Sequence, residues 1–479
     1  MSRTAHDPTL ALAPLDRNSP EPLQAQLYRA LREAILAGRL GAGARLPSSR
    51  RLAQHLSLGR NTVLAVFEHL LAEGYVEARR GAGTVVAALP PVAPPAPQPS
   101  RALSARIGML MGIEVPRGHG WGENLTPGTP DLSHFPFAEW SRLLARRWRR
   151  PGRELLVPDS PAGYPPLRAA IAEWLGRTRA VRCTPEQVMI VSGSQQALDL
   201  AARVLLDPGD VAMVEDPGYN GLKGVLRAAG AEIAAVPVDE NGFDPAGAEL
   251  LWPQAKLACV TPSHQFPTGA TMPLARRLAL VDWARRRAGW IIEDDYDGEF
   301  RHACPPLAAL QGLDDEQRTI HLGTFSKSMF PGLRLGWLVL PEDLMPPFLA
   351  ARRLADMAPP SLTQAAMADF MAEGLFAQHM KRMRTVYAVR RDAFTQACAR
   401  HLPEIGTLVA GESGLHSVLW LHRGCDRAAS AKVRAAGLTV PPLSDYRLHS
   451  GPPGLVLGWG NVEEGRMEAV VGRLARALA

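Results

Sequence analysis

A run rich in proline divides this chain of 479 residues into two unequal parts. Six of the twelve residues from Leu89 to Ser100 are proline. Because proline lacks a backbone N–H group and has a fixed φ angle, this run cannot form a helix or a central strand. It predicts an extended, semi-rigid spacer, which we place at residues 89–118. We therefore expect a polar tail at 1–19, a small domain at 20–88 and a large domain at 119–479.

Charge and cysteine content limit the cellular compartment and the classes of partner that we expect for this chain. The net charge is +6, and residues 20–88 hold nine arginines, no lysine and five glutamates, a local surplus compatible with nucleic acid. The five cysteines form no CxxC pair and no zinc spacing, so we expect reduced thiols and no metal site. With no signal peptide and no long apolar run in view, we expect a cytoplasmic protein without a membrane partner.

The small domain shows three helical segments and a ribbon. Apolar residues at helical spacing predict a helix over 23–37, and a second helix starts at Pro47–Arg50, where Ser48 or Ser49 can cap it. After a short turn a third helix begins at Arg60, and 75–86 then predicts two strands. The pattern fits a winged helix-turn-helix whose third helix reads DNA bases. Its basic wing tip, with Arg79, Arg80, Gly81 and Gly83, would touch phosphates; a three-helix bundle with solvated arginines fits the same pattern.

The large domain alternates short apolar runs with helical patterns from about Trp121. This alternation predicts an α/β domain with a mostly parallel sheet, in which ligands bind at the carboxyl ends of the strands. We expect a smaller α+β subdomain from about residue 350. The expected strands are 187–191, 211–214, 257–260, 290–293 and 318–322, and the expected helices include 195–206, 221–229 and 274–288.

The segment Gly323–Trp337 is the most informative stretch of the large domain. It places Lys327 between hydroxyl residues in a loop after a predicted strand. An amine in such a loop suits Schiff-base chemistry, and Thr324, Ser326 and Arg334 could hold a phosphate. A surface loop with ordinary basic residues is the alternative.

Three further segments lie at the ends of predicted strands. A carboxylate in Glu293–Asp297 could hold a pyridinium nitrogen, although a magnesium site or an acidic turn fits too. The segment 193–197 opens a helix and could bind phosphate or simply cap that helix. Tyr219 could stack on an aromatic ring or have a structural role.

Two resemblances to known families combine these features. The string from Gly38 to Ala53, with Arg60–Val63 and Gly81–Thr84, resembles the GntR-type winged helix. That resemblance implies that Arg50, Arg60 and Thr62, with the wing glycines, contact operator DNA. From about Trp121 onward the chain resembles fold type I enzymes that depend on pyridoxal 5'-phosphate (PLP), of the aminotransferase class. The combination resembles the MocR subfamily of regulators.

The second resemblance implies a role for each matching residue. Lys327 would bind PLP covalently, Asp294 would pair with the pyridine nitrogen and Tyr296 with the ring hydroxyl. Asp295 competes with Asp294, but the spacing to Tyr296 favours Asp294. Tyr219 would stack on the ring. The residues implied for the phosphate are Ser194, Gln195, Thr324, Ser326 and Arg334.

The chain departs from the aminotransferase pattern at the positions expected to bind the ring hydroxyl and the substrate carboxylate, and it also lacks a tyrosine near Pro158 that in many relatives reaches the phosphate of the partner subunit. Where those enzymes have an asparagine that bonds the ring hydroxyl, this chain has His264-Gln265, so either residue could take its place. The strand 454–459 lacks the arginine that holds a substrate carboxylate, and Arg447 in the preceding loop is the nearest candidate for an effector. Amino-acid turnover is therefore less expected than PLP binding.

Three functions compete on this pattern. The first is a homodimeric regulator that binds operator DNA, PLP and an amine or amino-acid effector. The second is an active aminotransferase with an accessory DNA-binding domain. The third is a DNA-binding protein whose large domain binds no cofactor. The intact set of Lys327, Asp294, Tyr296 and Arg334 argues against the third, and the missing arginine argues against the second.

Overall fold

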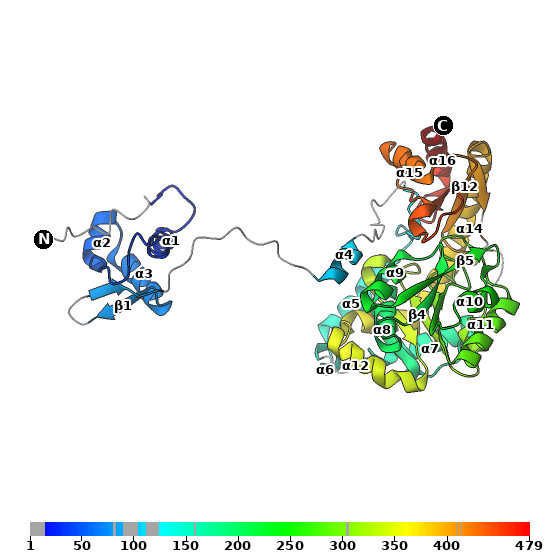
Figure 1. Ribbon diagram of the computed structural model, residues 1–479, viewed down its shortest axis with the longest axis horizontal. Helices are drawn as coiled ribbons and strands as arrows, with labels where there is room; N and C mark the ends of the chain where they lie inside the picture. The colour runs from blue at the N-terminus through cyan, green and yellow to red at the C-terminus, as the bar shows by residue number, and fades with distance from the viewer. Residues whose placement is uncertain are drawn as a thin grey trace. The chain divides into compact units, whose positions relative to one another are not determined.

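The computed structural model describes residues 15–79, 83–89, 104–111, 124–157, 160–302, 306–409, 411 and 413–479. The chain divides into two compact units, residues 1–102 and 103–479 (Figure 1). The predicted spacer at 89–118 is wrong for part of its length, because helix α4 (Ala105–Met111) lies within it and packs beside α9 (Asn220–Ala229). The dense run of prolines ends at Pro99, and residues 105–111 contain no proline that would prevent a helix.

The small unit is a winged helix-turn-helix, as predicted. Ser48 caps the second helix, since its Oγ accepts a hydrogen bond of 3.3 Å from the Arg51 backbone N–H. Ser57, with φ of 50°, begins the tight turn into the third helix. Buried apolar side chains from all three helices and the ribbon form one core. The elements are α1 (Leu23–Leu36), α2 (Ser49–Leu56), α3 (Arg60–Ala72), β1 (Val76–Arg79) and β2 (Gly83–Val86).

The end of the predicted tail belongs to this unit. Leu15 packs against the core, and the Arg17 guanidinium donates to the carbonyls of Leu56 and Ser57 at 3.2 and 2.9 Å. Those carbonyls end α2 and have no partner within the helix. The predicted tail at 1–19 therefore extends too far, because Leu15 and Arg17 belong to the small unit. Residues 1–14 lie outside the described residues.

The large unit is built on an eight-stranded sheet of order β3-β10-β9-β8-β7-β4-β5-β6, in which β10 and β6 run antiparallel to their neighbours. The mostly parallel sheet confirms the predicted fold class, and each of the five predicted strands is present. Their bounds are β3 (Val188–Val191), β4 (Val211–Asp216), β5 (Glu232–Asp239), β6 (Gly242–Phe243), β7 (Leu257–Val260), β8 (Trp290–Asp295), β9 (Thr319–Thr324) and β10 (Gly336–Val339).

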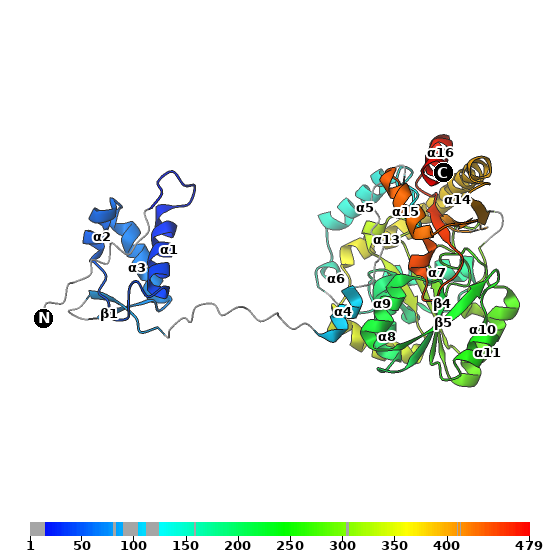
Figure 2. The ribbon, with the colours of Figure 1, turned by 45° about the horizontal axis from the view of Figure 1, so that its top comes forward.

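Helices cover both faces of this sheet (Figure 2). Side chains alternate along each strand, so Val214 of β4 packs with α8, α9 and α12, while Met213 packs with α10 and α11. A third core lies beside β3 and β10. Besides α9, the helices of this part of the large unit are α5 (Phe137–Arg149), α6 (Arg153–Leu156), α7 (Pro165–Arg179), α8 (Ser194–Leu205), α10 (Pro245–Leu251), α11 (Leu274–Arg287), α12 (Met345–Ala355) and α13 (Ser361–Ala372).

A smaller three-stranded sheet of order β11-β12-β13 completes the large unit. The predicted start of this subdomain near 350 is too early, because α12 packs against α8, and α13 against α5 and α7. The elements of the small layer are α14 (Leu375–His401), β11 (Gly406–Val409), β12 (His416–Leu421), α15 (Asp426–Ala435), β13 (Gly454–Gly458) and α16 (Glu464–Leu478). Among the described helices, none combines the length and the apolar character that crossing a membrane requires.

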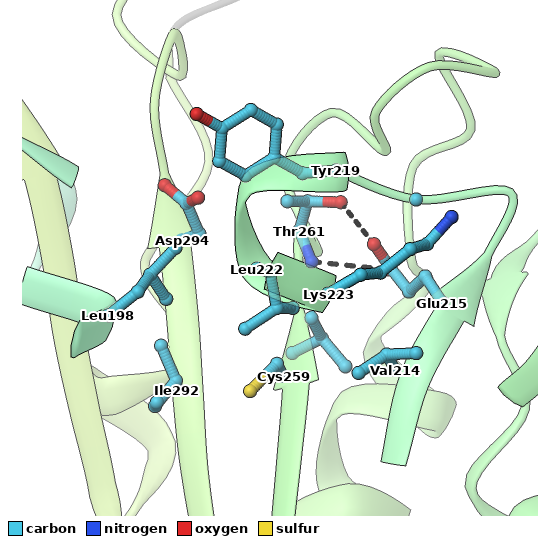
Figure 3. Close-up of a pocket in the computed structure, with 12 residues that line it drawn as sticks. Leu198, Val214, Glu215, Tyr219, Leu222, Lys223, Cys259, Thr261, Ile292 and Asp294 are labelled. Carbon is cyan, nitrogen blue, oxygen red and sulfur yellow. Dashed lines mark hydrogen bonds between the residues drawn. The ribbon is translucent and has the colours of Figure 1, made fainter. Parts of the chain in front are cut away.

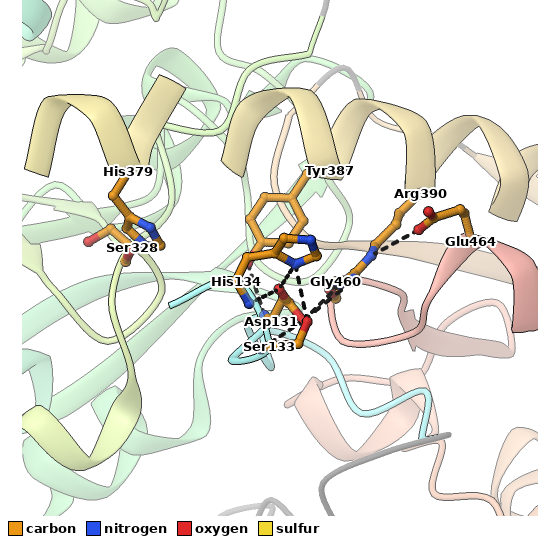
Figure 4. Close-up of polar contacts among 9 residues, drawn as sticks. All are labelled: Asp131, Ser133, His134, Ser328, His379, Tyr387, Arg390, Gly460 and Glu464. Carbon is orange, nitrogen blue, oxygen red and sulfur yellow. Dashed lines mark hydrogen bonds and ion pairs between the residues drawn. The ribbon is translucent and has the colours of Figure 1, made fainter. Parts of the chain in front are cut away.

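A buried ionic network fixes the chain where it enters the large unit (Figure 4). The Asp131 carboxylate lies 3.3 Å from the guanidinium of Arg390, which is fully buried on α14 and also donates to the Gly460 carbonyl at 2.6 Å. Burial alone would raise the pKa of Asp131, but hydrogen bonds from Ser133 and His134 and the charge of Arg390 lower it overall. The network joins three distant segments.

Removal of the Asp131 carboxylate should destabilise the protein, because it leaves the buried Arg390 guanidinium with only the more distant and exposed Glu464 carboxylate, at 3.8 Å. We expect Asp131→Ala to lower the free energy of unfolding by roughly 3–5 kcal/mol at pH 7, measured by urea denaturation. Since the pKa of Asp131 is lowered in the folded state, its contribution is present at neutral pH and lost on acidification. Asp315→Ala, which removes a carboxylate that is 84% exposed, is the control; equal losses would contradict this role.

Candidate functional site

The DNA-binding candidates of the helix-turn-helix lie at the starts of two helices, Arg50 on α2 and Arg60 with Thr62 on α3. Arg50 and Arg60 are exposed, and neither forms an ion pair within the described part of the chain. Helix α3 begins after Gly59 without a side-chain cap, so its first N–H groups are also available. Thr62 lies half-buried in the first turn. Exposed cations at helix starts, together with free N–H groups, are suited to phosphate oxygens.

The wing is described only in part. Arg79 ends β1 and pairs with Glu77 at 3.2 Å, so its charge is partly neutralised. Gly83 opens β2 with φ of +79°, a conformation that favours glycine. Arg80 and Gly81 lie outside the described residues.

Lys327 lies in the loop after β9, at the carboxyl edge of the large sheet. Its Nζ donates a hydrogen bond of 2.7 Å to the Gly128 carbonyl. Burial lowers the pKa of Lys327, although the charges of Asp297 and Asp294 oppose this. A lowered pKa increases the fraction of neutral amine, which is the nucleophilic form.

Asp294 is a half-buried residue near the end of β8, and its inner carboxylate oxygen has no partner. Its Oδ1 forms no hydrogen bond with any described residue. Burial, followed by the charges of Asp295 and Glu215, raises the pKa of Asp294 to about 7. Asp295 points to the other face of the strand, where Arg179 lies 2.8 Å away and His321 3.3 Å away. The geometry therefore favours Asp294 as the carboxylate that faces a ligand.

Tyr219 covers a pocket between β4, β7 and β8 (Figure 3). Its ring lies above the pocket with the Asp294 carboxylate beside it, and its hydroxyl donates to Gln195 Oε1 at 3.2 Å. Across the pocket Thr261 donates to the buried Glu215 carboxylate at 2.5 Å. Burial raises the pKa of Glu215 to about 7 despite this bond. A tyrosine ring with a carboxylate beside it suits a flat, nitrogen-containing ring as a ligand.

The start of α8 provides a place for an anion. Gly193 has φ of +103°, and a Cβ there would lie 3.5 Å from the Arg334 guanidinium. Helix α8 then begins at Ser194 without a side-chain cap, and Arg334 forms no ion pair within the described residues. The hydroxyl groups of Thr324 and Ser326, which precede Lys327 in the sequence, lie 3.0 Å apart. Gln195 instead donates its amide to the Gly221 carbonyl at 3.0 Å.

His264, rather than Gln265, faces Tyr296. His264 Nδ1 lies 2.9 Å from the Tyr296 hydroxyl and 3.0 Å from the Asp297 carboxylate. Gln265 is turned away, because its amide donates to the Pro217 carbonyl at 2.9 Å and to Glu215 at 3.1 Å. The arrangement leaves His264 and Tyr296 as the pair at the position expected for a ring hydroxyl.

His416 on β12 is a site residue that the sequence analysis did not find. Its ring centre lies 4.8 Å from that of His264, and neither of its nitrogens forms a hydrogen bond of good geometry. With Asp297, these histidines offer possible metal ligands within 4.8 Å of one another, a group not expected from the sequence. No motif marks His416, since tertiary folding alone brings β12 to this edge.

Arg447, the predicted partner of an effector carboxylate, lies elsewhere. Its guanidinium sits 5.9 Å from the ring centre of Trp420, and its charged neighbours are Asp216 and Asp426. Trp420 is four residues along β12 from His416, about 13 Å at the rise of a strand. Arg447 does not line the pocket beneath Tyr219.

Comparisons with known proteins agree with this division of the chain. Residues 23–86 match the gntR family of bacterial regulatory proteins, and residues 124–450 match aminotransferase class I and II. MocR, a probable rhizopine catabolism regulatory protein of Rhizobium meliloti, is 40% identical over 97% of this chain and 95% of that protein. The pyridoxine biosynthesis regulator PdxR of Corynebacterium glutamicum is 31% identical over 98% of this chain and 99% of its own length.

Solved structures agree as well. LysN, an α-aminoadipate aminotransferase of Thermus thermophilus solved with N-(5'-phosphopyridoxyl)-L-leucine, is similar with a TM-score of 0.69 and 29% identity, covering 78% of this chain and 94% of LysN. Fold and site thus define a winged helix joined to an aminotransferase domain of class I and II. The chain belongs to the gntR family of bacterial regulators, within the MocR subfamily, and is a DNA-binding transcription regulator.

The raised pKa of Asp294 predicts that ionisation of this carboxyl lowers the free energy of unfolding of the ligand-free protein. Because the pKa is near 7 when folded and near 4 when unfolded, stability should fall as the pH rises between these values. Asp294→Asn removes this cost, so the ligand-free variant should exceed the wild type by roughly 1–3 kcal/mol at pH 8 and match it at pH 4. Urea denaturation at both pH values measures this; a less stable variant at pH 8 would rule it out.

Proposed function

We propose that this regulator holds PLP on Lys327 and changes its binding to operator DNA when an amine or amino-acid effector enters the site. The observation that carries the proposal is a set of three ionisable groups at one sheet edge, none of which forms an ion pair within the described residues. They are the Lys327 amine, the Asp294 carboxylate without a partner and the Arg334 cation at the start of α8. These groups match an aldehyde, a pyridine nitrogen and a phosphate.

Each remaining residue would then have a defined task. Asp294 would hold a proton on the pyridine nitrogen, and Tyr296 with His264 would bond the ring hydroxyl. Tyr219 would cover the ring, while Ser194, Thr324, Ser326 and Arg334 would bind the phosphate. PLP supplies an aldehyde that condenses with amines and a ring that withdraws electrons. A metal on His264, Asp297 and His416 would compete for the same space.

Regulation further requires that the effector favour one arrangement of the protein over another. The contact from Lys327 to the Gly128 carbonyl places the reactive amine against the segment that enters the large unit. We place the regulator in the cytoplasm as a homodimer, since repeated half-sites in operator DNA need two binding heads. The relatives are named for different pathways, so their names do not select an effector.

An active aminotransferase remains the second candidate. The presence of Lys327 with Asp294 and Tyr296 favours it. The strand β13, with sequence Gly454-Leu-Val-Leu-Gly458, is buried and carries no arginine to hold a substrate carboxylate. Regulation by binding alone fits this site better than amino-acid turnover.

Lys327 should be the residue that binds PLP covalently. Borohydride treatment of the wild type should fix a phosphopyridoxyl group on the peptide that contains Lys327, and Lys327→Ala should show none by mass spectrometry. Lys223 offers a matched control, because it is also buried, lines the pocket and has its pKa lowered to about 8. Label on Lys223, or label retained in Lys327→Ala, would overturn the assignment.

Arg50 and Arg60 should contribute directly to operator binding. We expect Arg50→Ala and Arg60→Ala each to weaken binding of a duplex from the DNA beside this gene by roughly 1–3 kcal/mol, measured by fluorescence anisotropy. A lost phosphate contact should also reduce the salt dependence of binding. Arg177→Ala removes an exposed charge from the large unit and should have no effect. Equal effects of the three variants would exclude a contact specific to Arg50 and Arg60.

A further inference from the structure

A short loop of the small layer, just before β13, is bonded to the turn that carries Tyr219. Asn220, which follows Tyr219, donates its side-chain amide to the Asp445 carbonyl at 2.9 Å. The N–H of Gly218, which precedes Tyr219, donates to the Tyr446 carbonyl, also at 2.9 Å. Both sides of this tyrosine are therefore attached to a segment that is distant along the chain.

Asp216, the last residue of β4, holds the other end of the same loop. Its carboxylate accepts hydrogen bonds from the backbone N–H groups of Leu448 and His449, at 2.7 and 3.0 Å. The exposed His449 ring adds a third contact at 3.0 Å. A buried carboxylate that accepts from two consecutive N–H groups fixes both the position and the direction of that backbone. We call residues 445–449 the clamp loop.

Lys223 completes the contact from the first turn of α9. It is 4% exposed, and its amine donates to the Tyr446 carbonyl. Burial lowers the pKa of Lys223 to about 8, and the charge of Asp216 offsets part of this effect. Although Lys223 lines the pocket beneath Tyr219, its amine points away from Asp294 (Figure 3). The amine therefore holds the clamp loop and is not directed at a ligand.

The clamp loop is also packed into both layers of the large unit. The ring of Tyr446 is buried with Val418 of β12 and Val456 of β13. Leu448, two residues further on, packs against the same core cluster as Tyr219. A shift of the small sheet would therefore carry the loop with it, and the loop would carry the turn of Tyr219.

We propose that Asp216 and Lys223 are positioning residues for the cofactor, because they fix the clamp loop to the start of α9 and so hold the Tyr219 ring over PLP. This inference rests on the proposed function, in which Tyr219 covers the ring of PLP. Neither positioning residue needs to touch PLP itself. The same contacts join the small layer to the cover of the site, so a ligand that moves one of them also moves the other.

Hydrogen exchange tests the clamp in the ligand-free, full-length protein. Asp216→Asn replaces one acceptor oxygen with a donor, and Lys223→Met removes the ammonium. Peptides that contain Gly218 or residues 448–449 should then exchange about 3- to 10-fold faster than in the wild type, measured by mass spectrometry. Lys256→Met is the control, since it removes an exposed lysine of the same unit. Wild-type exchange rates in both clamp variants would overturn the inference.

Titration with PLP tests the positioning role. Lys223→Met should weaken PLP binding by about 3- to 10-fold and reduce the circular dichroism of the bound cofactor, because the ring is held less firmly. Lys223→Arg keeps a cationic donor and should restore most of both signals. Leu280→Ala, which creates a cavity on the other face of the sheet, should lower the stability to urea and leave both PLP signals unchanged. Equal PLP signals in the wild type and Lys223→Met, or an equal loss in Leu280→Ala, would overturn the positioning role.

The two experiments separate failure of this inference from failure of the proposed function. Wild-type protein that shows no PLP absorbance would overturn the proposed function, and with it the role of Tyr219 as a cover. Wild-type protein that binds PLP, with clamp variants that match it in exchange and in both PLP signals, would overturn the inference alone. Faster exchange together with weaker PLP binding in the clamp variants supports it.

Discussion

The site of the large unit is arranged around one carboxylate whose inner oxygen has no partner within the described residues. This carboxylate belongs to Asp294, which lies near the end of β8 in the middle of the eight-stranded sheet, where burial raises its pKa to about 7. A folded protein keeps an uncompensated acid in such a place at a cost in stability, and a cationic ligand recovers that cost. The strands β4, β7 and β9 end at the same edge of the sheet as β8. The loops after them place Tyr219, His264 and Lys327 at this edge.

The entry segment of the large unit is held by polar contacts of two different kinds. Asp131 is fixed by the buried Arg390 and by Tyr387, whose hydroxyl accepts from the Asp131 N–H at 3.0 Å (Figure 4). Three residues earlier, Gly128 is held by the Lys327 amine. In the proposed function, the second contact would be lost when the Lys327 amine reacts with PLP, whereas the first contact does not involve Lys327. A change at Lys327 would therefore act on a segment that stays anchored at Asp131.

Local sequence chemistry predicted the elements better than it predicted the site. Apolar runs located five strands, and motif order placed Lys327, Asp294 and Tyr219 at one edge. The spacing to Tyr296 already favoured Asp294 over Asp295, and the pairing of Asp295 with Arg179 agrees with that choice. The choice between His264 and Gln265 needed side-chain direction, which the sequence does not give. His416 could not be found, because its contacts join β12 to a loop far away in sequence. The helix α4 was missed because the prolines before it dominated the pattern.

Net charge alone does not locate the DNA-binding face of this chain. Many arginines of the large unit are neutralised: Arg147 pairs with Asp369 at 2.5 Å, and Arg286 pairs with Glu249 at 2.8 Å. A paired guanidinium must give up its carboxylate before it can bind a phosphate and release counterions, so its electrostatic gain is small. Arg50 and Arg60 carry no such cost, since they form no ion pair within the described residues. The pairing state of each arginine, rather than the total charge, identifies the surface available to DNA.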